Sequence, residues 1–318
     1  MATFSTTYLP LARSCRWLRG NHHGHSTVSD GTDDPLTNVR VYEAAGYDYL
    51  ALSEHDMLLD PSELQARTRM CLLPAVEVTS ASGQTLMVLG STADPPPRRA
   101  CTAAQIMAHA QAAGALFIVD HPNWLYRPGR LHIGDDELEG LSVLRGMEIY
   151  TGVIERLAGS AQATDRWDRL LARGSRVFGH ATDDQHAPDD RFIAWNCVQW
   201  PDDQDPTAPG VLEALSNGRF YPSTGVAIER LGVSDGGDQI VIESDADAIH
   251  WIGTGGIIVH KSTGGSARFA VDDLSDCPFA PRREDGQVDL AKLLYLRAEC
   301  FGRGSARAWT QPFWLVTD

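Results

Sequence analysis

The sequence predicts an α/β domain followed by a smaller all-β domain. From Arg16 to about Gly225, short apolar runs alternate with stretches of helical periodicity, a pattern that favours parallel strands joined by crossover helices. After Gly225 the helical periodicity is absent, and short strand-like runs are separated by Gly- and Asp-rich turns, which favours a small sandwich. A length of 318 residues is enough for two buried cores. We expect domains at residues 1–225 and 226–318.

Helices are expected in the first domain where glycine follows a stretch of helical periodicity. Asp34 can cap the first helix, and Gly46, Gly114 and Gly174 each close one, as glycine does at helix C-termini. The expected helices span residues 35–45, 102–113, 161–173 and 209–217.

Strands are expected where four to eight apolar residues lie between turn residues. Those of the first domain span residues 48–53, 71–80, 84–90, 115–119, 146–151, 175–181 and 193–199. Those of the second span residues 227–234, 239–244, 249–254, 257–261, 267–271, 292–298 and 309–316.

The charge of the chain argues against a nucleic-acid polymer as its partner. The formal net charge is −15, the sequence pI is about 5.1, and Lys and Arg form no run. Such a protein repels phosphate backbones, whereas a small anion held by a bound metal remains compatible with it. We therefore expect a small-molecule substrate, anionic in character. The sequence gives no indication of oligomeric state.

The sequence carries no signal for a membrane or an export route. No run of about 18 apolar residues is present, and the first residues lack the basic and apolar regions of a signal peptide. The six cysteines are widely spaced, without a C-x-x-C pair, which favours reduced thiols. These features predict a cytoplasmic protein that contacts no membrane.

The most informative stretch is residues 21–31. Three of the eleven histidines, His22, His23 and His25, fall within four positions and are followed by Asp30. Side chains alternate in an extended chain, so His23 and His25 point to one face and His22 to the other. Two imidazoles on one face with a nearby carboxylate suit a divalent metal.

More candidate ligands follow the ends of the predicted strands. His55, His121, Asp184 and His186 each lie just after the carboxyl end of a strand, which is where α/β folds place their sites. This shared placement is improbable for histidines scattered over a surface. The pattern therefore predicts a metal site at that edge of the sheet.

These motifs resemble the PHP (polymerase and histidinol phosphatase) superfamily between Arg16 and Pro222. The segment Ala308–Pro312 is similar to the sandwich appended to some stand-alone bacterial members. The motifs that carry the resemblance are His23-Gly24-His25, Ser29-Asp30-Gly31, Glu54-His55-Asp56, Glu77 in Ala-Val-Glu-Val-Thr, Asp120-His121-Pro122 and Asp184-Gln185-His186.

The resemblance implies a distorted, TIM-like barrel of seven β/α units that holds two or three divalent metal ions, commonly manganese, iron or zinc. It also implies phosphoester hydrolysis by a metal-bound hydroxide, with Asp184 or a neighbouring acid–histidine pair that includes His186 moving the proton. The implied ligands are His23, His25, Glu77 and Asp184 for one ion, Glu77 and His121 for a second, and Asp30, His55 and His186 for a third.

One position departs from the family pattern. The family places another histidine in the strand after Glu77, and here the corresponding residue is Gln84, or Thr85 if the register slips by one. A glutamine oxygen is a weaker ligand than imidazole for a transition metal, so the sequence leaves the number of ions open.

Several residues near the ligands are candidates for supporting roles. Arg127 and Arg191 follow His121 and His186 in the chain and are expected to bind a phosphate oxygen. Trp124 and Tyr126 are candidates for the wall of an organic leaving group, with packing between the domains as the alternative. The candidates for support behind the ligands are Gln84, His180, Asp183 and Glu148.

The sequence thus favours a metal-dependent phosphatase or phosphodiesterase acting on a small organic or nucleotide phosphate. One alternative keeps the metals and cleaves a carbamate, ester or amide bond. A second is a metal-binding module without catalysis. Arg127 and Arg191 distinguish the first two, because phosphate loses its best partner if neither arginine reaches the metal cleft.

Overall fold

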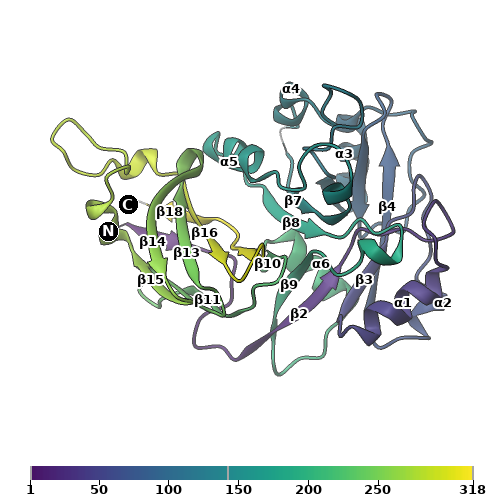
Figure 1. Cartoon of the computed structure of the whole chain (residues 1–318), viewed down its shortest axis with the longest axis horizontal. Coiled ribbons are helices and arrows are strands. Elements are labelled where there is room, and N and C mark those ends of the chain that lie inside the picture. Colours follow the sequence, from purple (N-terminus) through teal and green to yellow (C-terminus); the bar gives the residue numbers. More distant parts are fainter. Residues whose placement is uncertain (1, 142, 317–318) are drawn as a thin grey trace.

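A single 15-stranded sheet runs through the chain in the computed structural model, which describes residues 2–141 and 143–316. Figure 1 shows its N-terminal part with most of the helices around it, and its C-terminal part with short strands on the opposite side of the molecule. The sheet order is β1-β18-β16-β17-β10-β9-β2-β3-β4-β5-β6-β7-β8, with β13 and β14 branching from β16.

The strands and helices have these bounds. The first ten strands are β1 (Thr3–Ser5), β2 (Cys15–Asn21), β3 (Tyr49–Leu52), β4 (Cys71–Thr79), β5 (Thr85–Leu89), β6 (Leu116–Val119), β7 (Gly146–Thr151), β8 (Phe178–Thr182), β9 (Trp195–Pro201) and β10 (Phe220–Ser223). The others are β11 (Ile228–Val233), β12 (Gln239–Ser244), β13 (Ala248–Gly253), β14 (Ile257–Thr263), β15 (Ser266–Ala270), β16 (Tyr295–Phe301), β17 (Arg307–Trp309) and β18 (Phe313–Val316). The α-helices are α1 (Pro35–Ala44), α2 (Ser62–Gln65), α3 (Ala103–Ala112), α4 (Asp135–Glu139), α5 (Thr164–Ala172) and α6 (Ala208–Ser216). Short 3-10 turns are η1 (Gly152–Arg156), η2 (Pro188–Asp190), η3 (Thr254–Gly256), η4 (Val271–Asp276) and η5 (Leu290–Lys292).

Local signals in the sequence account for the main helices. Asp34 accepts hydrogen bonds from the first turn of α1, and Thr102 forms a reciprocal capping box with Gln105 at the start of α3. The four helices expected from periodicity are present as α1, α3, α5 and α6. The first three are slightly shorter than expected, and α6 begins and ends one residue earlier than expected. The short helices α2 and α4 were not expected, because four or five residues carry too little periodicity to be recognised.

The N-terminal strands are only partly parallel. β2, β3 and β4 pair in parallel, as do β6, β7 and β8. β5 is antiparallel to both β4 and β6, so the expectation of parallel pairing is wrong there. Only residues 80–84 join β4 to β5, and a parallel partner needs a crossover of about a dozen residues or more. Gly83, with φ of 93°, allows the tight turn.

The ladders do not close β2 to β8 into a continuous ring within the described residues. The extensions of β2 and β8 meet through an isolated bridge between Gly24 and Gln185. Between β8 and β9, the side-chain amide of Asn196 takes the place of ladder hydrogen bonds. Its oxygen accepts from the Ala181 N–H (3.0 Å), and its nitrogen donates to the Ala181 carbonyl (2.6 Å). The fold is therefore a mixed α/β fold with a sheet rich in parallel pairs. The expected closed barrel is not established by the strand pairing.

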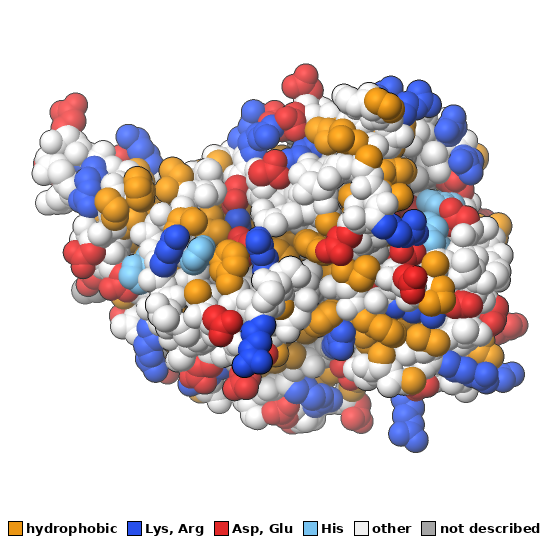
Figure 2. Space-filling model, in the orientation of Figure 1, with side chains coloured by type: hydrophobic (Ala, Val, Ile, Leu, Met, Phe, Trp, Pro, Cys, Tyr) orange, Lys and Arg blue, Asp and Glu red, His pale blue; other side chains and the backbone are white. Residues whose placement is uncertain are grey.

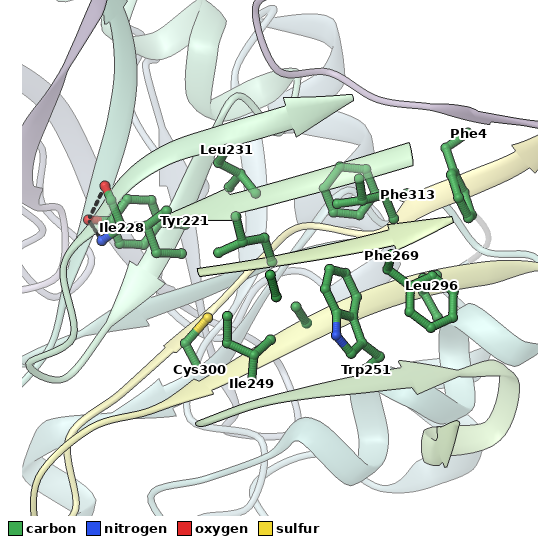
Figure 3. Close-up of a cluster of buried hydrophobic side chains, with 14 of the residues drawn as sticks. Phe4, Tyr221, Ile228, Leu231, Ile249, Trp251, Phe269, Leu296, Cys300 and Phe313 are labelled. Carbon is green, nitrogen blue, oxygen red and sulfur yellow. Dashed lines mark hydrogen bonds between the residues drawn. The ribbon is translucent and has the colours of Figure 1, made fainter. Parts of the chain in front are cut away.

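The C-terminal part is antiparallel and has two layers. β11, β12 and β15 form a separate three-stranded sheet. Ile228, Leu231 and Phe269 from this sheet pack with Trp251 and Phe313 from the larger sheet in one buried cluster, shown in Figure 3. The expected antiparallel β structure after residue 225 is thus confirmed.

Strand pairing and a buried ion pair join the two parts. β1 pairs with β18, so the first described residues lie with the C-terminal strands. β10 pairs with β17 through Ser223 and Ala308. Arg297 on β16 donates two hydrogen bonds to Asp168 on α5 (2.7 and 2.6 Å). Both side chains are buried, at 1% and 6% relative exposure, so each charge depends on the other.

Two observations concern the helices and one face of the surface in the part of the chain that the structure describes. No helix there is long and apolar enough to cross a membrane. On the face shown in Figure 2, Lys and Arg side chains are interspersed with Asp and Glu.

Replacing Arg297 with alanine is expected to lower the free energy of unfolding by about 3–5 kcal/mol, because Asp168 would be left buried without its partner. Urea unfolding at neutral pH measures the change. The matched control is Arg230→Ala, which breaks an exposed pair with Glu243 and should cost less than about 1 kcal/mol. Equal effects for the two variants would contradict a role of the pair in joining the two parts.

Candidate metal centre

Five histidines and three carboxylates gather at one edge of the N-terminal sheet. Most of them come from segments that follow the strands, as the strand-end rule predicts, whereas one carboxylate, Glu77, lies within β4. The group consists of His23, His25, His55, His121, His186, Asp30, Glu77 and Asp184. All eight ligands inferred from the sequence are therefore brought together. His22 lies against His180, with ring centroids 5.0 Å apart, and points away from the group as expected.

Glu77 on β4 is the central carboxylate. Its Oε2 lies 3.0 Å from His55 Nδ1 and 3.2 Å from His25 Nε2. The same oxygen is 3.5 Å from His23 Nε2, while Oε1 is 3.3 Å from His121 Nε2. Because its two oxygens face different imidazoles, Glu77 has the geometry of a bridging ligand.

Asp184 completes the inner part of the group. Its Oδ1 lies 3.1 Å from His25 Nε2 and 3.2 Å from His23 Nε2, and its Oδ2 lies 3.8 Å from His121 Nε2. All these side chains are buried. The inner part thus offers three imidazoles and two carboxylates within a few ångströms.

An outer part lies closer to solvent. Asp30, whose side chain is 53% exposed, lies 3.4 Å from His55 Nε2 and 3.5 Å from His186 Nε2. His25 also faces Asp30, through Nδ1 at 3.8 Å. His25 therefore lies between the two parts of the group.

The donor set fits transition-metal ions. His25, Asp30, His55 and His186 offer atoms within 4.8 Å of one another, and so do the sets His23–His121–Asp184 and His23–His25–Glu77. Imidazole and carboxylate donors at this spacing suit manganese, iron or zinc. His23 Nε2 and Glu77 Oε2 are buried without a hydrogen-bond partner, which is costly unless a ligand completes them.

Two of the ligands have unusual backbone conformations. His121 has φ of 27° and Asp184 has φ of 51°, in the region that non-glycine residues avoid. Such conformations cost on the order of 1–3 kcal/mol each and persist where the surroundings enforce them. Here they turn both side chains into the group.

A layer of polar residues fixes the ligands from behind. Glu148 on β7 lies 2.7 Å from His23 Nδ1 and accepts from the His121 N–H at 2.8 Å. Thr151 and Thr182 also donate to Glu148, at 2.7 and 2.5 Å. A carboxylate behind a ligating imidazole fixes its tautomer and orientation, which is the supporting role expected of Glu148.

The other expected supporting residues are less close to the ligands. Asp183 accepts from the N–H groups of residues 192–194 and from the Tyr42 hydroxyl (2.7 Å), so it orders the segment after His186. His180 packs on His22 and Phe220, and neither of its ring nitrogens has a hydrogen-bond partner. Neither residue contacts a ligand through a hydrogen bond in the described residues.

The carboxylates of the group raise the pKa values of four of its histidines, which are His23, His25, His55 and His186. Burial lowers the pKa of His23, but Asp184, Glu148 and Glu77 outweigh it and raise that pKa well above its ordinary value. The pKa values of His25, His55 and His186 are also raised by their carboxylate partners against the effect of burial. The metal-free group therefore holds protons where a metal would bind.

The ligands open into a cavity of about 630 Å³. Arg98, Arg99 and Arg156 line it, and Trp124 and Tyr126 contribute its aromatic wall as expected. The lining residues in full are Ser29, Asp30, His55, Glu77, Thr79, Gly83, Thr85, Arg98, Arg99, His121, Trp124, Tyr126, His132, Val153, Ile154, Arg156, Leu157, Asp184 and His186.

The arginines expected to bind phosphate are not among the described residues that line the cavity. Arg191 donates to Asp33 and to Asn38 (2.8 Å) with its side chain mostly buried. Arg127 lies beside the Tyr126 ring, on the exposed part of the loop. Proximity in sequence to a ligand did not place either side chain in the cavity: Arg191 is engaged by Asp33 and Asn38, and Arg127 is exposed although its neighbour Tyr126 lines the cavity.

Thr85, rather than Gln84, occupies the position where the family has its extra histidine. Thr85 lines the cavity with Oγ1 3.5 Å from His121 Nε2. Gln84 points elsewhere, because it contacts Ser80 and donates to Glu137 (2.6 Å). A shift of one residue turns a side chain to the other face of a strand. Of the two residues considered from the sequence, Thr85 is therefore the one that faces the candidate ligands.

Sequence reasoning missed His132 and the three arginines of the cavity. Arg98 and Arg99 lie in the loop after β5, and Arg156 lies in η1 directly after β7. The rule that found the ligands, a position just after a strand, would have found Arg156. His132 is in a loop eleven residues after His121, and no local pattern marks it.

Replacing Glu148 with glutamine is expected to weaken metal binding by about 10–100-fold, because His23 would lose the carboxylate that orients it. Competition with a chromogenic chelator measures the dissociation constant. Glu137→Gln is a control, since Glu137 contacts Gln84 outside the ligand group. Unchanged affinity in Glu148→Gln would contradict the orienting role.

The raised histidine pKa values predict opposite pH dependences for the metal-free and metal-loaded protein. Histidines with raised pKa values stabilise the metal-free fold fully below their ordinary value of 6.5, and this stabilisation is lost as pH rises through the folded-state values. The pKa values of the Asp30, Glu77 and Asp184 carboxylates are lowered, so these groups change the pH dependence of stability only at acid pH.

Thermal unfolding between about pH 6 and about pH 9 should therefore show metal-free protein losing stability as pH rises. Added metal should stabilise more at high pH, where fewer protons compete for the ligands. Parallel curves for the two forms would contradict proton–metal competition at this group.

The chain was compared with known proteins. No protein-family model matches the sequence, and no curated protein matches it. Among solved structures, a two-domain protein from Bacteroides vulgatus, described as containing a predicted PHP-like metal-dependent phosphoesterase, matches with a TM-score of 0.51. It is 18% identical, and the match covers 83% of this chain and 89% of that one.

Two further structures match over a shorter part. One is described as a metal-dependent phosphoesterase from Bifidobacterium adolescentis, with a TM-score of 0.42, 15% identity and coverage of 63% of this chain and 96% of that one. The other is an amidohydrolase from Chromobacterium violaceum, with a TM-score of 0.42, 16% identity and coverage of 62% and 96%. The fold assignment rests on the first match: over most of its length, this chain has the fold of a two-domain PHP-like protein.

Proposed function

We propose that this protein is a PHP-type metal-dependent hydrolase that cleaves a phosphoester of a small organic molecule. The observation that carries the proposal is the group of five histidines and three carboxylates at the floor of a cavity that also presents arginines. Two or three divalent ions, manganese, iron or zinc, would be held by the inner and outer parts of the group. When bound, such ions activate water and neutralise charge that develops on the ester.

The residues of this chain supply positioning and proton transfer. Asp184 is buried among three histidines. Its main-chain carbonyl lies 3.0 Å from His186 Nδ1, so Nδ1 carries its proton there, and His186 Nε2, which lies 3.5 Å from Asp30, is the nitrogen that can exchange a proton. His186 lines the cavity, within reach of a leaving group. Asp190 holds the backbone of this segment by accepting from the N–H groups of His186 and Ala187 (3.1 and 2.9 Å).

Arginines in the cavity favour an anionic substrate. Asp190 accepts two hydrogen bonds from Arg156 (2.5 and 2.9 Å), and Arg98 lies 3.5 Å from Asp56. Arg99 has no carboxylate within salt-bridge distance among the described residues, so its charge is available to a ligand. The backbone of Arg99 has a φ of 59°, which is a strained conformation. The hydrogen bond from the Arg99 N–H to the Thr79 carbonyl (2.9 Å) holds this residue in place. Guanidinium groups bind phosphate oxygens in a bidentate manner.

A carbamate, ester or amide substrate is the second candidate. The apolar side of the cavity, formed by Trp124, Tyr126, Val153, Ile154 and Leu157, favours it, because such substrates carry no charge of their own. Arg127 and Arg191, the residues expected to select phosphate, do not line the cavity. Arg99, the one cavity arginine without a carboxylate partner among the described residues, supports phosphate as the first candidate. The complete ligand set argues against a module without catalysis.

The proposal is tested by assaying metal-loaded protein with p-nitrophenyl phosphate, bis(p-nitrophenyl) phosphate and 1-naphthyl methylcarbamate. We expect turnover of a phosphate ester that is lost in His25→Ala together with the bound metal. Turnover of the carbamate alone would place the second candidate first. Full activity in His25→Ala would rule out the metal centre itself.

Arginine variants separate phosphate recognition from metal binding. Arg99→Gln should lower kcat/KM for the phosphate ester by about 10–100-fold, the effect of one charged hydrogen bond, with metal content unchanged. Arg127→Gln is the matched control, since Arg127 is exposed outside the cavity. Equal effects of the two substitutions would contradict the assignment of Arg99.

A further inference from the structure

His132 forms part of the cavity wall beside the metal ligands. Its side chain is buried, with 3% relative exposure. The ring meets His121 edge-on, with centroids 4.4 Å apart, and stacks on Trp124 at 5.4 Å with an interplanar angle of 28°. His132 and Trp124 thus present neighbouring, nearly parallel rings to the cavity.

One main-chain group fixes which nitrogen of His132 carries the proton. The Thr85 N–H donates to His132 Nε2 at 2.9 Å, and the Thr85 carbonyl lies 3.2 Å from the same nitrogen. A ring proton on Nε2 would satisfy the carbonyl but would meet the hydrogen of the Thr85 N–H. Because the backbone N–H always carries its hydrogen, Nε2 must offer its lone pair.

The proton of a neutral His132 therefore lies on Nδ1. No hydrogen-bond acceptor for Nδ1 is found among the described residues, whereas the ring itself lines the cavity. Among the described residues, the Nδ1–H of His132 is therefore a donor that a ligand in the cavity can pair with. Nε2 is also unable to bind a metal while it accepts from Thr85, so His132 does not replace the missing family histidine.

We propose that His132 is a specificity-determining residue that donates its Nδ1–H to an acceptor atom of the substrate's organic group. That group is flat, because the cavity wall offers it the aromatic rings of Trp124 and Tyr126, while its acceptor atom meets the edge of the His132 ring, in whose plane the Nδ1–H bond lies. Its acceptor is a heteroaromatic nitrogen or a carbonyl oxygen, and a group that presents only an N–H is disfavoured because two donors would meet. The substrate class rests on the proposed function, whereas the tautomer does not.

The tautomer is tested directly by long-range ¹H–¹⁵N correlation spectra of zinc-loaded, ¹⁵N-histidine-labelled protein. The His132 signals are identified by their loss in His132→Phe. We expect protonated Nδ1 and unprotonated Nε2. A proton on Nε2, or a doubly protonated ring, would overturn the proposal without touching the proposed hydrolysis.

Specificity is tested with phenyl phosphate and pyridin-3-yl phosphate, which differ in one acceptor nitrogen. At a pH where the pyridine is neutral, kcat/KM should favour the pyridyl ester by about 2–10-fold, the range of one neutral hydrogen bond. His132→Phe keeps a flat ring without a donor and should bring the ratio to about one. His260→Phe, at an exposed position on β14, should keep the wild-type ratio.

A preference that survives in His132→Phe, or its absence in the wild type, would overturn the proposal. If neither ester is hydrolysed, the proposed function fails but the inference remains testable. The His132 resonances should then shift more on titration with 3-hydroxypyridine than with phenol. Equal shifts would overturn the inference independently.

Discussion

The site depends on one buried carboxylate, Glu77. It lies among four imidazoles, at 3.0 to 3.5 Å, that come from segments distant in sequence. A buried charge of this kind is tolerated only when opposite charges or metals surround it. The strands that carry the partners must therefore meet at one edge. The strained backbone at His121 and Asp184 and the hydrogen bonds of Glu148 follow from this requirement.

The cavity opens at the same edge of the sheet, and two kinds of side chain, cationic and apolar, line it. The loop after β5 supplies Arg98 and Arg99, and the segments after β6 and β7 supply the apolar side chains. The two apolar segments are tied together, since Trp124 and Gly159 form an isolated bridge. A ligand in this cavity therefore meets cationic side chains from the loop after β5 and from η1, where Arg156 lies beside Val153, Ile154 and Leu157. The segment after β6 adds flat aromatic side chains.

Four of the candidate ligands, His55, His121, Asp184 and His186, could be proposed from the sequence because each follows the end of a strand, a signal that is visible locally. His23, His25 and Asp30 were indicated by their own cluster, whereas Glu77, which lies inside β4, came only from the family resemblance. The helices α1, α3, α5 and α6 were predictable for a similar reason, since periodicity and caps are local. The antiparallel insertion of β5 depends on a short turn and was missed. Arg191 and Arg127 were misplaced because a side chain's direction in a loop depends on distant partners such as Asp33. His132 was missed because only tertiary contact with Thr85 gives it a role.

The β4–β5 hairpin carries a consequence for how such a protein diverges. Glu77, Thr85 and the loop with Arg98 and Arg99 lie on one continuous stretch of about 25 residues. Replacement of this stretch as a unit would alter the ligands at the inner ions and the cations of the cavity together, while leaving the remaining ligands in place. A change in this one hairpin and its loop would therefore act on the candidate metal group and on the charge of the cavity together.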